Sequence, residues 1–211
     1  MRCLGLISLA IIALPAVGAI VDRTAIAVGT KVITESDIIR RIRLEAFQNG
    51  TRPDYGLTSR REAAQRLIDL KLVEHEMDLG HYPGTSPEAA KELLDAFAAE
   101  RFPASADVLR LALADLDLTP ADLQAELAEQ ADLLSFTSLR LRPAVQISDQ
   151  EIEEYYHNHI ESASATPIPL AEVRAKIEDI LINQRADLNL DAWLQDQRKR
   201  ARIIYLVKEL Q

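Results

Sequence analysis

Strand-like patterns occur only near the two ends of this 211-residue chain. Near the N-terminus, AVGTKVITESD (residues 27–37) has the pattern of a strand, a two-residue turn, a second strand and a helix start. Gly29 stands at the first turn position, where a type II′ turn needs a positive φ that glycine adopts without strain. Near the C-terminus, RIIYLV (residues 202–207) is rich in β-branched residues. Because an isolated hairpin is marginal in water, we expect this run to add a third strand.

Between the two ends, the chain has the pattern of seven helices. They are expected to open near residues 35, 60, 87, 107, 120, 149 and 169, the last with a bend near Asn189. Three residue pairs have capping-box spacing and mark helix starts: Thr34 with Asp37, Ser59 with Glu62, and Ser148 with Glu151. Apolar stripes include Leu134 in the fifth helix and Leu188 in the seventh. The sequence therefore predicts a mostly α-helical fold with one small β-sheet.

The composition is that of a globular protein, because 48% of residues are hydrophobic and 27% are charged. The formal net charge is −9. Non-specific binding of nucleic acid depends on neutralising phosphates with Lys and Arg, so we expect no nucleic-acid partner.

Residues 1–19 have the pattern of a secretory signal peptide. A basic start at Arg2 precedes an apolar run from Cys3 to Val17, and small residues follow up to Ala19, after which we expect cleavage. An uncleaved anchor is the alternative, and it would make this segment the chain's membrane contact. Cys3 is the single cysteine, so the mature chain would have no disulfide and no thiolate chemistry. The signal peptide predicts export from the cytoplasm, and the predicted location, the bacterial periplasm, follows from the family resemblance described below.

No catalytic constellation stands out, and no cofactor is expected. The HNH run at residues 157–159 has i, i+2 spacing, which places the two rings on different faces of a helix rather than around a metal. The basic run at 198–202 suits a helix C-terminus, with a patch for an anionic partner as the alternative. Apolar and aromatic side chains that could line a peptide-binding groove are Phe136, Leu139, Tyr155 and Tyr156. Trp193 is expected in the core.

Four motifs occur in a recognisable order: VITESDI (32–38), LIDLKLVEHEMDLG (67–80), LTPADLQAELAEQ (118–130) and QISDQEIEEYYHNH (146–159). Together they resemble the N-terminal chaperone module of SurA-like periplasmic proteins, which are parvulin-type peptidyl-prolyl isomerases. The end of the chain, from PLAEVRAKIEDIL at residue 169, resembles the segment after the isomerase domain in that family. The relatives carry a parvulin domain where this chain has only residues 160–168, a length in which no domain can fold.

The resemblance implies a SurA-type or trigger-factor-type peptide-binding fold. We expect a helical chaperone domain with its hairpin at 20–159, a linker at 160–168, and a helix and strand at 169–211 that complete the same domain. It also implies an ATP-independent chaperone for unfolded or nascent envelope and outer-membrane proteins, with no enzymatic activity. Two alternatives stay open: a peptidyl-prolyl cis-trans isomerase by family membership, and an envelope adaptor that holds one specific partner.

Overall fold

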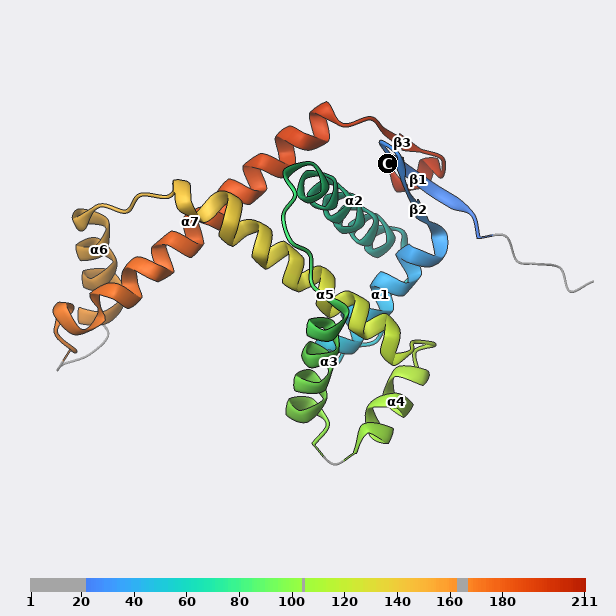
Figure 1. The fold of residues 1–211 in the computed structure, drawn as a ribbon, viewed down its shortest axis with the longest axis horizontal. Coiled ribbons are helices and arrows are strands. Elements are labelled where there is room, and N and C mark those ends of the chain that lie inside the picture. Colours follow the sequence, from blue (N-terminus) through green and yellow to red (C-terminus); the bar gives the residue numbers. More distant parts are fainter. Residues whose placement is uncertain (1–21, 104, 163–166) are drawn as a thin grey trace, which may run out of the picture.

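The computed structural model describes residues 22–103, 105–162 and 167–211, and the fold is mostly helical with one small sheet (Figure 1). The α-helices are α1 (Glu35–Asn49), α2 (Leu57–Gly80), α3 (Pro87–Arg101), α4 (Ala106–Ala114), α5 (Pro120–Phe136), α6 (Asp149–Tyr156) and α7 (Leu170–Arg200). The strands are β1 (Thr24–Val28), β2 (Lys31–Thr34) and β3 (Ile203–Tyr205). The predicted signal peptide and part of the predicted linker lie outside the described residues. The prediction of a mostly helical fold with one small sheet is confirmed.

The sheet joins the two ends of the described chain. β1 lies in the centre and pairs antiparallel with β2 on one side and β3 on the other. Ile26 of β1 stands opposite Ile33 of β2 and Tyr205 of β3. Gly29 has a φ of +58°, while Thr30 has no positive φ, as a type II′ turn requires. The third strand expected from the C-terminal run is therefore confirmed.

Two of the three predicted capping boxes are present at helix starts. Thr34 with Asp37 and Ser148 with Glu151 form reciprocal boxes at α1 and α6. The box expected at Ser59 is wrong, because α2 begins earlier, at Leu57, and the Ser59 hydroxyl donates to the Asp54 carboxylate over 2.5 Å. The same carboxylate accepts the N–H of Gly56 over 2.9 Å, so a loop aspartate organises this helix start.

Helices α5 and α7 differ from the sequence prediction in detail. α5 ends at Phe136 and continues as a π-helical turn (Thr137–Leu141) and a 3-10 turn (Arg142–Ala144). α7 runs uninterrupted through Asn189, where we expected a bend. Leu134 and Leu188 are 70% and 63% exposed, so their places on the predicted apolar stripes are wrong. Leucine spacing alone does not reveal which side of a helix finds a packing partner.

The core consists of two separate apolar clusters. The main cluster combines the sheet with α1, α2, the C-terminal end of α5, and α7, and it includes Ile26, Ile68 and Phe136. A second cluster joins α1 to α3, α4 and the start of α5, around Leu113 and Leu123. Figure 1 shows α3 and α4 at one end of α5 and α7 crossing near its other end. α5 therefore bridges the two clusters.

Candidate functional site

The middle of α5 borders a crevice, because its two ends are held by different apolar clusters. Leu123 at one end is fully buried in the second cluster, and Phe136 at the other is fully buried in the main cluster. Between them, α5 faces α1 and α2 across two adjoining pockets of about 350 and 540 Å³. Both volumes lie in the range of roughly 300–1,000 Å³ that ligand pockets occupy.

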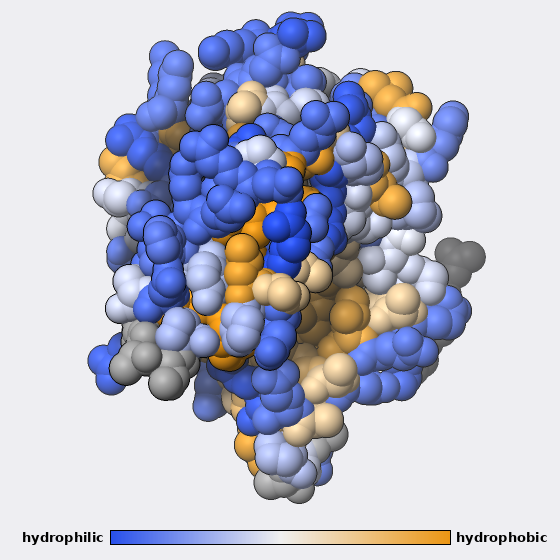
Figure 2. Space-filling view, turned by 90° about the vertical axis from the view of Figure 1, so that its left-hand side faces the viewer, coloured by the Kyte–Doolittle hydropathy of each residue, from blue (hydrophilic) through white to orange (hydrophobic). Residues whose placement is uncertain are grey.

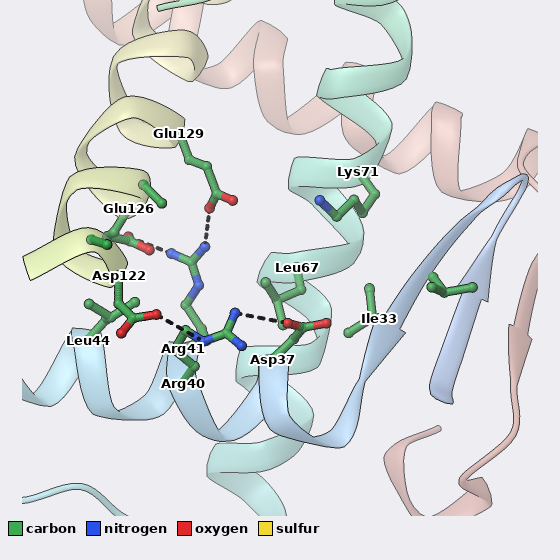
Figure 3. A pocket seen from close by; sticks show the side chains of 13 residues that line it. Ile33, Asp37, Arg40, Arg41, Leu44, Leu67, Lys71, Asp122, Glu126 and Glu129 are labelled. Carbon is green, nitrogen blue, oxygen red and sulfur yellow. Dashed lines mark hydrogen bonds and ion pairs between the residues drawn. The ribbon is translucent and has the colours of Figure 1, made fainter. Parts of the chain in front are cut away.

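The two pockets share three charged residues: Arg41 of α1 and Glu126 and Glu129 of α5. Arg41 donates from Nη1 to Glu126 Oε1 over 2.5 Å and from Nη2 to Glu129 Oε2 over 2.7 Å. Figure 3 shows the Arg41 side chain reaching up from α1 between the two carboxylates. Arg41 and Glu126 are 8% and 3% exposed, so this is a buried ion pair across the crevice.

The buried pair is incompletely hydrogen-bonded. Gln130 donates to Glu126 Oε1 over 2.8 Å and to the side-chain oxygen of Gln48 over 3.1 Å. Glu126 Oε2 and Arg41 Nε, in contrast, have no hydrogen-bond partner among the described residues. An unmet buried donor or acceptor destabilises the folded state. The free protein thus carries one unused acceptor and one unused donor beside the crevice.

Burial changes the acid strength of Glu126. Loss of solvation raises the pKa of this carboxyl above its ordinary value, and the positive charge of Arg41 and the Gln130 hydrogen bond only partly oppose that effect. The nearby carboxylates of Glu129 and Glu45 add a smaller contribution in the same direction as burial. Keeping the Glu126 carboxyl ionised in the folded protein therefore costs free energy.

The smaller pocket combines charged and apolar residues, and helix caps fix part of its lining. Asp37 and Asp122 are the capping-box carboxylates of α1 and α5, and Arg40 lies between them, 3.1 Å from Asp37 Oδ1 and 3.4 Å from Asp122 Oδ1. Figure 3 shows this second arginine bridge beside the Arg41 pair. Lys71 of α2 lies on the opposite side of the pocket. Four carboxylates and three cations therefore line this pocket.

The larger pocket is lined by apolar and polar residues together. The apolar residues come from α2, α5 and α7 and are Leu70, Val73, Leu133, Leu190 and Leu194. α1 contributes only polar residues to the lining, and among them Glu45 binds Arg66 of α2 through two hydrogen bonds of 2.6 Å. Figure 2 shows apolar residues gathered in a hollow on one face of the molecule, with hydrophilic residues around it. A surface of this kind suits an amphipathic ligand.

The residues predicted to line a peptide groove lie on three different elements. Phe136 is fully buried, with its ring centroid 5.0 Å from that of Trp193 and 5.9 Å from that of Tyr82, so it is a core residue here. Leu139 is 51% exposed on the π-helical turn after α5. Tyr155 and Tyr156 belong to α6. The ring centroid of Tyr155 lies 4.5 Å from that of His159.

Tyr156 also serves a structural contact, because its hydroxyl donates to the carbonyl of Ile168 over 2.8 Å. Trp193 packs against the main cluster, as expected. In the basic run, Arg198 binds the Asp69 carboxylate of α2 through Nε over 2.7 Å. Over residues 22–103, 105–162 and 167–211, no three His, Cys, Asp or Glu side chains are grouped to hold a metal ion.

Sequence analysis missed the Arg41–Glu126 pair. Arg41 lies three residues after Ile38 and one before Ile42, both buried, so it falls on the apolar face of α1. A cation on an apolar face signals a buried partner, but the partner is 85 residues away and only tertiary structure identifies it.

No family model matches the chain, and no curated protein matches it significantly. In the part of the chain that the structure describes, no helix is both long and apolar enough to cross a membrane.

Proposed function

We propose that this protein is an ATP-independent chaperone of the bacterial periplasm that binds unfolded or nascent envelope proteins in the crevice beside α5. The observation that carries the proposal is the mixed lining of the crevice, which combines five apolar residues with polar and charged side chains. An unfolded chain offers both apolar side chains and backbone amides, and such a surface can contact both. The order of the SurA-like motifs and the signal-like N-terminus support the same function.

The test is suppression of aggregation. A urea-unfolded outer-membrane β-barrel protein is diluted into buffer with increasing amounts of this protein, and light scattering is followed. We expect scattering to fall as the protein reaches and exceeds the client concentration. Leu133→Ser in the crevice should weaken the effect, whereas Leu139→Ser, which changes a half-exposed residue outside the crevice, should not. Unchanged scattering at several-fold excess would rule out the chaperone function.

Two further measurements separate the alternatives. In a pull-down from envelope extract, many sub-stoichiometric proteins indicate a chaperone, while one stoichiometric protein indicates an adaptor. Turnover of a proline-containing tetrapeptide above the uncatalysed rate would indicate an isomerase and contradict the non-enzymatic function proposed here.

A further inference from the structure

The smaller pocket runs along the edge of strand β2. Val32 and Ile33 are consecutive residues of this strand, and both line the pocket. Consecutive side chains of a strand point to opposite faces, and accordingly Val32 is 54% exposed while Ile33 is 1% exposed. A pocket that contacts both residues must therefore lie beside the backbone at the strand edge, rather than on one face of the sheet.

The register of the hairpin shows which backbone groups this edge offers. A two-residue turn makes Val28 and Lys31 a hydrogen-bonded pair, so the next pair, Ala27 and Val32, is not hydrogen-bonded across the two strands. The N–H and C=O of Val32 consequently point away from β1. Two residues on, the N–H of Thr34 also points outward, but it donates to the Asp37 carboxylate over 2.9 Å. Within the described residues, Val32 is thus where the β2 edge keeps a free donor and acceptor.

The opposite side of the same pocket carries the buried charged pair. Arg41 and Glu126 line it, and their Nε and Oε2 atoms are buried without partners among the described residues. The Val32 edge, by contrast, is exposed and needs one acceptor and one donor, which one edge of a peptide backbone supplies.

We infer that the crevice takes up an extended polypeptide segment as an additional strand on β2. One edge of the segment exchanges hydrogen bonds with Val32, and its other edge faces the Arg41–Glu126 pair. This mode rests on the proposed chaperone function and deepens it, because backbone hydrogen bonds hold a chain whatever its side chains are. Four carboxylates against three cations in the pocket, and a chain of formal charge −9, favour segments that carry lysine or arginine.

The test uses a labelled nonapeptide of alternating Val and Lys, with blocked ends, and measures its binding by fluorescence anisotropy. Two derivatives carry N-methyl groups, one on every Val nitrogen and the other on every Lys nitrogen. Because the N–H groups of alternate residues point to opposite edges of a strand, each derivative loses the donors of one edge. Slipping by one residue would exchange the Val and Lys faces, so the peptide cannot evade the block by shifting register.

We expect the two derivatives to differ, with the weaker one losing about tenfold in affinity, the equivalent of one to two net hydrogen bonds. If the parent peptide binds and both derivatives bind as tightly as it does, or lose affinity equally, strand addition is overturned while the proposed function stands. If the parent peptide fails to bind, both the inference and the proposed function are overturned. Sedimentation tests a further alternative. If the protein is a dimer and the parent peptide dissociates it, the β2 edge binds a second copy of this chain, and the inference for client chains is overturned.

A protein variant provides an independent check. Val32→Pro removes the outward N–H, and proline is tolerated on edge strands where the N–H faces solvent. Val32→Thr is the matched control, because it retains the backbone donor. We expect the proline variant to bind the parent peptide about tenfold more weakly than the threonine variant does. If both variants fold and bind the peptide equally, the inference is contradicted. If the proline variant does not fold, the methylated peptides remain the test.

Discussion

Arg41 holds the middle of α5 to α1 by charge, although apolar residues surround it on its own helix. Its guanidinium is almost fully buried and bridges two carboxylates of α5. A buried ion pair stabilises a fold little compared with apolar packing, because both charges lose their hydration. Removing one partner is far more costly, because the other charge then stays buried alone. The pair thus keeps α5 in place without filling the crevice with apolar side chains.

This asymmetry predicts the effect of breaking the pair. Arg41→Met should lower the free energy of unfolding by about 3–5 kcal/mol, because Glu126 loses its compensating charge. Adding Glu126→Met should recover most of that loss. Arg40→Met is the control on the neighbouring residue: Arg40 is half-exposed, so a change within about 1 kcal/mol is expected. Urea unfolding followed by circular dichroism measures all three variants, and equal losses for Arg41→Met and Arg40→Met would refute the argument.

At the scale of elements, the C-terminal segment is part of the core rather than an appendage. After β3, the N–H groups of Leu206 and Val207 donate to the carbonyl of Ala25 in β1 over 2.9 and 3.2 Å. The side chains of Val207 and Leu210 are buried in the main cluster. Arg61 of α2 donates to the carbonyl of Glu209 over 2.7 Å. The last nine residues therefore close the sheet and also cover α2.

Two leucines of this segment give a matched test. Leu210 is 4% exposed and Leu206 is 53% exposed. Leu210→Ala should cost about 2–5 kcal/mol of unfolding free energy, because it leaves a cavity in the main cluster. Leu206→Ala should stay within about 0.5 kcal/mol. Deletion of residues 203–211 should destabilise the protein more than either substitution. Thermal unfolding is the measurement, and a deletion variant that melts like the full chain would show that the segment does not hold the fold together.

Local signals explain how far sequence alone could predict the elements. The turn at Gly29 and the boxes at Thr34 and Ser148 depend on residues within a few positions of one another, and each of these predictions is confirmed. The start of α2 was missed because a loop residue, Asp54, competes for the Ser59 hydroxyl. The crevice could not be predicted, because it arises where α5 bridges two clusters, and no short sequence pattern encodes that spacing.

At the scale of the whole molecule, α6 stands apart from the rest of the fold. Figure 1 shows it beside the N-terminal half of α7, away from the sheet and α2. Its buried residue Ile152 belongs to neither the main nor the second cluster. Ion pairs join it to α7, among them Glu151 to Arg185 at 2.6 Å. Few apolar contacts and exposed ion pairs characterise segments that open before the global transition.

The pH dependence of this opening follows from Glu151. The pKa of Glu151 is lowered from its ordinary 4.5 to about 2. The largest cause is the hydrogen bond from the backbone N–H of Ser148, followed by that from the Ser148 hydroxyl and then by that from Arg185. A lowered pKa in the folded state adds stability above the unfolded value, and that stability is lost as the pH falls from 4.5 towards 2. Glu151→Gln should therefore speed amide exchange in α6 at pH 6, and the difference from the wild type should shrink at pH 3.

Trp193 is the single tryptophan of the chain and packs against the main cluster, so its fluorescence reports the core alone. We expect the urea transition of Trp193 to be the same in Glu151→Gln and the wild type, because α6 opens before the core unfolds. A parallel shift of the Trp193 transition would mean that α6 and the core unfold together. The crevice and its strand edge would then be coupled to α6, and ligand binding in the crevice would slow α6 exchange as well.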